Sequence, residues 1–179
     1  LRFDFSHYEG LTPEQIAAQD SPYVEGMVGF SALGLPFNLD AWDGFPAARE
    51  RLYTSAKKTG ARLVTVTGDT HTAWANTLHD DAGDQRGVEF GCTSITSPGM
   101  GSVIKDVPNL GELFTDANKE VDWHDPFGHG YIVMTLTPDT AHAEFKKVSG
   151  ILTTDWTVDS VSAWKAEAED TGMSDLKPA

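Results

Sequence analysis

The stretch GARLVTVTGDTH, residues 60–71, decides the fold class of this chain. Its β-branched run over residues 62–67 lies between two glycines and predicts a strand. Good helix formers fill residues 46–58 just before it, with lysines near the end, so we expect a helix that Gly60 ends in the left-handed conformation. A helix followed by a tight turn and a strand indicates an α/β fold.

The rest of the chain supplies further expected elements. A second strand is predicted over residues 87–92, as a hairpin partner or a sheet neighbour of the first. Residues 131–137 and 140–148 predict a β-hairpin around a Pro-Asp turn. The apolar spacing over residues 158–169 predicts an amphipathic helix that closes the chain.

The first 40 residues are rich in glycine, proline and scattered aromatic residues. A short helix is expected over residues 12–19, where Thr12 can cap it, Pro13 takes its first position and Gln15 completes a capping box. We expect the remainder of this segment to form ordered loop.

Composition limits both the size and the partners of the protein. With 179 residues and 40% hydrophobic content, the chain suits one packed domain over residues 1–179. The net charge of -14 opposes binding to nucleic acid or to an anionic membrane surface. The lone cysteine, Cys92, cannot form an intrachain disulfide, and no apolar run approaches the roughly 20 residues of a membrane span. A first residue other than methionine suggests a processed or cut polypeptide.

The sharpest chemical signal is Gly68-Asp69-Thr70-His71, directly after the first expected strand. A strand that ends at a glycine can deliver a carboxylate and an imidazole to the carboxyl edge of a sheet, where open α/β sheets bind ligands. Carboxylate oxygen and neutral imidazole nitrogen together suit Zn, Mn or Fe, and the carboxylate alone suits Ca or Mg. The alternative is that Asp69 caps a helix over residues 70–78 while His71 only packs or forms a hydrogen bond.

Three other places hold unusual polar or aromatic residues. Residues 89–99 place four hydroxyls and one thiol after a strand. They either form part of a functional site or form a turn whose hydroxyls satisfy its own backbone. Residues 122–129 hold two histidines and two aspartates, which either add a ligand or substrate contact or form a plain turn. Trp42 lies in a loop between acidic residues, where it either forms the wall of a pocket or packs as an ordinary aromatic residue.

Four segments of the chain, taken in order, form a recognisable set. They are WDGFPAAR at residues 42–49, GDTH at residues 68–71, the Glu-Phe…Thr-Ser-Pro-Gly pattern of residues 89–99, and Asn118 followed by Gly130-Tyr131 and Leu136-Thr137-Pro138. Together they resemble the motifs of the PhoD-like alkaline phosphatases, including that family's Gly-Asp-x-His metal motif. The resemblance covers residues 38–148, with Phe45, Lys119 and His129 standing where the family commonly has Tyr, Pro and Arg.

The resemblance implies a metallophosphoesterase-type α/β/β/α sandwich, of which this chain forms the C-terminal half. It implies a multinuclear site of calcium and iron, with other divalent metals possible, and hydrolysis of phosphate mono- or diesters in the periplasm or outside the cell. Under this resemblance Asp69 and His71 are metal ligands. Trp42, Asp43 and Asn118 are candidates for contact with the substrate or with the metal ligands, although Lys119 weakens the case for Asn118.

An upstream counterpart to the Asp69 motif is expected from the family, whose members take most metal ligands from a preceding half of the domain, but none precedes Asp69 here. We therefore expect an incomplete site, completed by the missing N-terminal half or by another chain. We also expect association or homo-oligomerisation through the exposed half-sandwich. The leading hypothesis is a metal-dependent phosphatase acting on a phosphoester. The competing hypothesis is a non-catalytic binding or assembly module that retains half of the sandwich.

Overall fold

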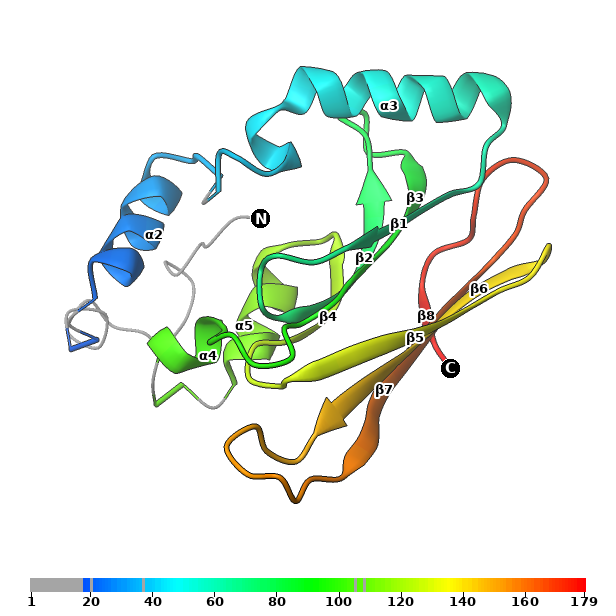
Figure 1. Ribbon diagram of the computed structural model, residues 1–179. Helices are drawn as coiled ribbons and strands as arrows, with labels where there is room; N and C mark the ends of the chain where they lie inside the picture. Colours follow the sequence, from blue (N-terminus) through cyan, green and yellow to red (C-terminus); the bar gives the residue numbers. More distant parts are fainter. Residues whose placement is uncertain (1–17, 20, 37, 105, 108) are drawn as a thin grey trace.

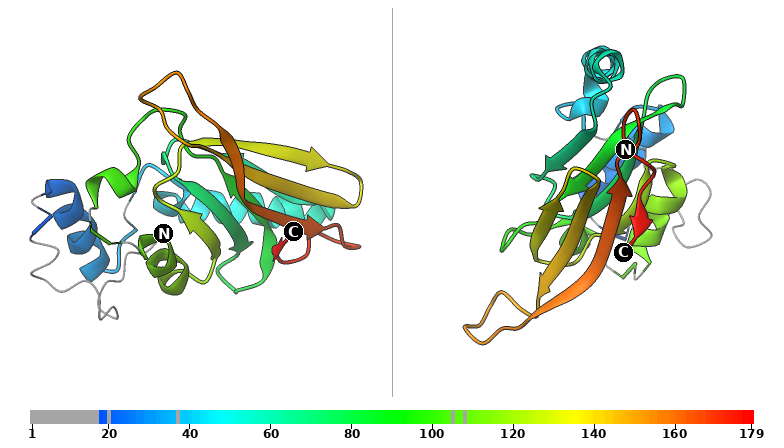
Figure 2. Two further views of the ribbon diagram at one scale, coloured as in Figure 1. Left: turned by 90° about the horizontal axis from the view of Figure 1, so that it is seen from below. Right: turned by 90° about the vertical axis from the view of Figure 1, so that its right-hand side faces the viewer.

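Two four-stranded β-sheets, with helices beside one of them, form the part of the chain that the computed structural model describes. The described residues are 18, 19, 21–36, 38–104, 106, 107 and 109–179. Figures 1 and 2 show helices, first sheet and second sheet as successive layers. This is the mixed α/β architecture that the sequence predicts.

The first sheet, sheet A, has the strand order β1-β3-β2-β4. β1 pairs with β3 in parallel, and β2 lies antiparallel to both β3 and β4. The expected strands 62–67 and 87–92 are therefore confirmed, as parallel neighbours rather than as a hairpin. The strands of sheet A are β1 (Leu63–Thr67), β2 (Ala73–His79), β3 (Gln85–Gly91) and β4 (Val121–Asp125).

β2 contradicts the helix that the alternative interpretation placed over residues 70–78. Ala73 and Ala75 belong to the core between the sheets, whereas Trp74 between them packs against the helices. This alternation is the period of a strand, and pairing with β3 and β4 on both sides satisfies the backbone. The segment has few β-branched residues, so its conformation depends on tertiary pairing that local propensity does not reveal.

The second sheet, sheet B, is antiparallel throughout, in the order β5-β6-β7-β8. The expected hairpin of residues 131–137 and 140–148 is confirmed as β5 and β6. The helix expected over residues 158–169 is wrong, because this segment is β7. Trp164 and Ala166, two positions apart on this strand, both face the core between the sheets. The strands of sheet B are β5 (Gly130–Leu136), β6 (Thr140–Val148), β7 (Val158–Glu167) and β8 (Lys177–Pro178).

Helices cover the other face of sheet A and enclose a second apolar core around Trp74. Those in this core are α2 (Pro22–Ala32), α4 (Met100–Val103) and α5 (Leu110–Ala117). A further helix, α3 (Pro46–Thr59), lies along the β1 side of the sheet (Figure 1). It ends at Gly60, whose φ of 64° is the expected left-handed conformation, so the helix predicted over residues 46–58 is confirmed.

α2 corrects the expectation of ordered loop for the described part of the first 40 residues. Val24 and Met27 are buried in the same core as Trp74, so tertiary packing stabilises a helix that a glycine-containing segment does not predict locally. The helix expected over residues 12–19 lies outside the described residues except for its last two positions. Within the described ranges, no helix is long and apolar enough to cross a bilayer.

Candidate metal centre

Three strands of sheet A end at one edge, and the loops that follow them meet there. β1 pairs with β3 in parallel. β4 also runs parallel to β3, because β2 is antiparallel to both of them. The carboxyl ends of these strands therefore carry residues 68–72, 92–99 and 126–129 at the same edge. This is the kind of edge at which α/β sheets bind ligands, and it is where the Asp69 motif was expected.

The loop of residues 68–72 holds both candidate ligands in unusual backbone conformations. The φ angles are 69° at Asp69 and 58° at His71, in the left-handed region that non-glycine residues rarely adopt. Each such residue costs on the order of 1–3 kcal/mol, so the surrounding structure must stabilise the loop. Within it, the Thr70 amide donates to the Gly68 carbonyl oxygen at 2.9 Å and closes the turn.

One ring nitrogen of His71 is already bonded within the protein. Nδ1 lies 3.0 Å from the carbonyl oxygen of Pro98. A carbonyl oxygen only accepts hydrogen bonds, so Nδ1 carries the proton, and in the neutral ring Nε2 keeps its lone pair. A hydrogen bond that fixes the tautomer and the ring orientation in this way is the usual arrangement of a metal-binding histidine.

The main chain of His71 is held by the segment that follows β3. The Thr93 hydroxyl lies 3.1 Å from the His71 carbonyl oxygen and 2.7 Å from that of Gly128. Gly99 approaches so closely that a Cβ atom on it would lie 2.4 Å from the same His71 oxygen. The Thr93 hydroxyl thus bonds to main-chain carbonyls of two other loops, whereas Ser94 Oγ bonds to the Ser97 carbonyl oxygen within the segment of residues 89–99 itself.

The Asp69 side chain is exposed, and it makes no hydrogen bond or ion pair within the described part of the chain. Among the same residues, there is also no group of three or more His, Cys, Asp or Glu side chains that could hold a metal. Asp69 and His71 are two candidate ligands on one loop, a hard oxygen and a nitrogen.

Trp42 and Asp43 lie elsewhere, in the short helix η2 (Trp42–Gly44) before α3. Trp42 is 52% exposed. Asp43 forms an ion pair with Arg49 at 3.2 Å, and Arg49 also reaches Asp81 at 3.5 Å in the turn between β2 and β3. That turn is at the edge of sheet A opposite the candidate ligands, so the structure does not gather Asp43 into their group.

Asn118 is buried at the end of α5. Its side-chain amide donates to the Phe114 carbonyl oxygen at 3.0 Å, and its own carbonyl oxygen accepts from the Val121 amide at 2.9 Å. These bonds connect α5 to the start of β4, which gives Asn118 a structural role. Its expected contact with a substrate stays a prediction.

Two buried aromatic rings, Trp74 and His124, lie behind the loop of residues 68–72. They stack with centroids 3.5 Å apart, and Trp74 Nε1 donates to Thr70 Oγ1 at 3.0 Å. Burial lowers the pKa of His124 to about 4, and its Nδ1 donates to the Ala73 carbonyl oxygen at 2.9 Å, so the ring packs in the neutral form. The sequence alone does not reveal this contact, because only the strand conformation of β2 brings Trp74 to the loop.

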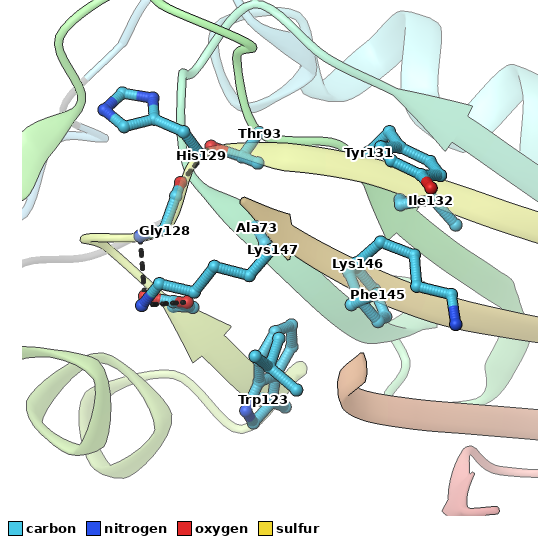
Figure 3. A pocket seen from close by; sticks show the side chains of 12 residues that line it. Ala73, Thr93, Trp123, Gly128, His129, Tyr131, Ile132, Phe145, Lys146 and Lys147 are labelled. Carbon is cyan, nitrogen blue, oxygen red and sulfur yellow. Dashed lines mark hydrogen bonds and ion pairs between the residues drawn. The ribbon is translucent and has the colours of Figure 1, made fainter. Parts of the chain in front are cut away.

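A small pocket lies next to the same edge (Figure 3). Its walls include Thr93, Trp123, His129 and Lys147. Lys147 Nζ lies 3.8 Å from the Asp125 carboxylate. Figure 3 shows the His129 ring and the Lys147 chain pointing in different directions, so the two basic side chains do not converge on one ligand.

Comparisons with known proteins show which family the chain resembles. A family model described as PhoD-like phosphatase matches residues 9–145. The chain is 28% identical over 171 residues to alkaline phosphatase D of Bacillus subtilis (strain 168), covering 88% of this chain and 27% of that protein. A solved structure described as that of PhoD is similar with a TM-score of 0.63 and 26% identity, over 78% of this chain and 26% of the solved chain.

The chain thus spans about a quarter of the length of these relatives. The structural match shows a metallophosphoesterase-type fold, as the resemblance implied. The family model covers most of the chain and includes the loop with Asp69 and His71. The chain therefore belongs to the PhoD-like phosphatase family.

Proposed function

We propose that this chain is part of a metal-dependent phosphatase and contributes Asp69 and His71 to its metal site. The intact protein hydrolyses phosphate mono- or diesters. The observation that carries the proposal is the pairing on one loop of an exposed carboxylate with an imidazole whose Nδ1 is bonded to Pro98. Membership of the PhoD-like phosphatase family supports the same class of reaction.

The donor set suits calcium and iron, the metals that the resemblance implies. Carboxylate oxygen is a ligand for calcium, and imidazole nitrogen with carboxylate suits iron or another transition metal. Such ions, when bound, neutralise phosphate charge, activate water and stabilise the leaving oxygen. Positive charge at this loop would also explain how a chain of net charge -14 accepts an anionic substrate.

The surrounding residues orient the two ligands in advance. Pro98 leaves Nε2 of His71 available, while Thr93 and Gly99 hold the main chain of the same residue. Ligands that are held in position by their neighbours lose less freedom when a metal binds. In this proposal, the chain's own task is to bind and orient metal, and through it the phosphoester.

Two protein donors are fewer than the roughly four to eight ligands that zinc or calcium takes, so water and further residues would have to complete the site. We propose that the longer protein or another copy of the chain supplies these residues, and that this chain alone has little or no activity. The chain covers only 27% of alkaline phosphatase D, which leaves room for such residues. We further propose a periplasmic or secreted location for the intact protein.

A non-catalytic binding or assembly module is the second candidate. The observation that favours it is that no third metal-binding side chain joins Asp69 and His71 among the described residues. Such a module would retain the fold and at most one weak metal site. Metal retention separates the candidates, because a complete multinuclear site resists mild chelation whereas two ligands do not.

Turnover of an aryl phosphate with added calcium and iron tests the proposal. The 179-residue chain should show little turnover, the full-length protein should be active, and Asp69→Asn in the full-length protein should abolish the activity. Asp155→Asn is the matched control, since Asp155 is an exposed aspartate in the loop between β6 and β7. A full-length protein with no turnover supports the module, and full activity of Asp69→Asn excludes Asp69 as a ligand.

A further inference from the structure

The indole of Trp74 connects the core behind sheet A to the loop that carries the candidate ligands. Trp74 is 4% exposed, stacked on His124 and met edge-on by Phe114 at 5.6 Å between centroids. Its one polar side-chain atom, Nε1, donates to Thr70 Oγ1 at 3.0 Å. Packing therefore fixes the ring, and the ring's only donor is used on the loop.

Thr70 stands between Asp69 and His71, and its hydroxyl is the centre of the loop's internal contacts. Oγ1 accepts from Trp74 and also lies 3.4 Å from both the carbonyl oxygen and the hydroxyl of Thr72. The residues on either side have the left-handed φ angles of 69° and 58°. Strained conformations of this kind persist only where neighbouring contacts hold them, and the Trp74 contact is one that the buried core supplies.

We propose that Trp74 is a positioning residue for the metal-binding pair. Through its hydrogen bond to Thr70, it holds Asp69 and His71 in their left-handed conformations and keeps the His71 ring against Pro98. The inference rests on the proposed function, because its consequence is the metal affinity of this pair. Trp74 itself touches neither candidate ligand's side chain in this scheme and acts through Thr70.

Conservative substitutions can remove this hydrogen bond from either end. Thr70→Val deletes the acceptor on an exposed residue outside the core, and Trp74→Phe deletes the donor while keeping an aromatic ring. Thr70→Ser retains the hydroxyl and should behave like the wild type. Trp123→Phe is the matched control, because Trp123 packs on Phe145 between the two sheets, with centroids 4.7 Å apart.

The direct readout is the tautomer of the His71 ring in the metal-free chain, measured by ¹⁵N NMR at a pH where the ring is neutral. The wild type, Thr70→Ser and Trp123→Phe should all show the Nδ1–H form that the Pro98 contact requires. In Thr70→Val and Trp74→Phe, the ratio of the Nε2–H tautomer to the Nδ1–H tautomer should rise about fivefold. This is the size of effect expected from the loss of one neutral hydrogen bond.

Packing alone makes a different prediction. If Trp74 only fills the core, Trp74→Phe will change the tautomer of the His71 ring and Thr70→Val will leave it unchanged. That result would overturn the proposal, and so would a wild-type tautomer of His71 in both variants.

Binding of Mn²⁺, followed by electron paramagnetic resonance, gives the functional consequence. Affinity should fall about fivefold in Thr70→Val and Trp74→Phe and recover in Thr70→Ser. Unchanged affinity in both would overturn the proposed effect on metal binding. A wild-type chain that binds no Mn²⁺ would instead count against the proposed metal site, and the tautomer measurement would still decide the role of Trp74.

Discussion

His71 Nδ1 and the Pro98 carbonyl oxygen lie 3.0 Å apart, although the two residues are 27 positions apart in the sequence. The loop after β3 therefore determines which nitrogen of His71 would be available to a metal. Gly99, directly after Pro98, also comes close to the His71 carbonyl oxygen. The two loops consequently behave as one structural unit.

Gly99→Ala should disturb this unit. The added Cβ would lie 2.4 Å from the His71 carbonyl oxygen and 3.4 Å from that of Pro126, so the backbone would have to move. We expect the free energy of unfolding in urea to fall by about 1–3 kcal/mol, with a parallel loss of Mn²⁺ affinity. Gly26→Ala is the control, because it lies in α2 with no neighbouring atom within 4 Å and should be neutral or stabilising. Equal behaviour of the two variants would contradict the close packing of the loops.

His124 should make the fold sensitive to mild acid. Burial lowers its pKa to about 4, whereas a histidine in the unfolded chain titrates at about 6.5. Because the folded pKa is depressed, the unfolded state takes up the proton first, and stability is lost as the pH falls from about 6.5 to about 4. His124→Phe should remove this part of the pH dependence, as measured by urea unfolding at a series of pH values.

The control for this experiment is Trp123→Phe on β4, which alters an aromatic core residue without removing a titratable group and should keep the wild-type slope over the same pH range. A slope that survives in His124→Phe would show that another group causes the acid sensitivity.

Asp80 should contribute to stability at neutral pH through the turn between β2 and β3. Burial alone would raise the pKa of its carboxyl, but hydrogen bonds from Arg86, at 2.7 Å, and from the amides of Asp84 and Ala82 hold the pKa below its usual range. A depressed folded pKa means that this stability is present above the usual aspartate pKa and is lost as the pH falls through the folded value. Asp80→Asn should therefore be destabilised at neutral pH and close to the wild type in strong acid, by thermal unfolding. A deficit that is the same at both pH values would argue against the charged hydrogen bonds.

Local signals predicted the elements that have strong boundaries. Gly60 ends α3 as expected, and the Pro-Asp turn joins β5 to β6. The failure at β7 has a specific cause, since Trp164 fits both a helical spacing with Val161 and a strand spacing with Ala166. Pairing with β6 decides between them, and that long-range contact has no signature in the segment itself.

The candidate site was predictable only in part. Asp69 and His71 followed from their chemistry at the end of a strand, but the contact with Pro98 depends on β1 and β3 being parallel neighbours. The Trp74 contact was not predictable either, because only the strand conformation of β2 brings the indole to the loop. Asn118 is a candidate only through the resemblance, and the structure shows it joining α5 to β4.

Titration of the ¹⁵N-labelled chain with Zn²⁺, followed through the ring nitrogens of its six histidines, tests the central claim most directly. Zn²⁺ is diamagnetic and accepts both imidazole nitrogen and carboxylate oxygen. We predict that Nε2 of His71 shifts at the lowest Zn²⁺ concentration while its Nδ1 stays protonated, and that Asp69→Asn weakens this response. A His71 ring that Zn²⁺ leaves unchanged, or a response that Asp69→Asn leaves intact, would contradict the assignment of this pair as metal ligands.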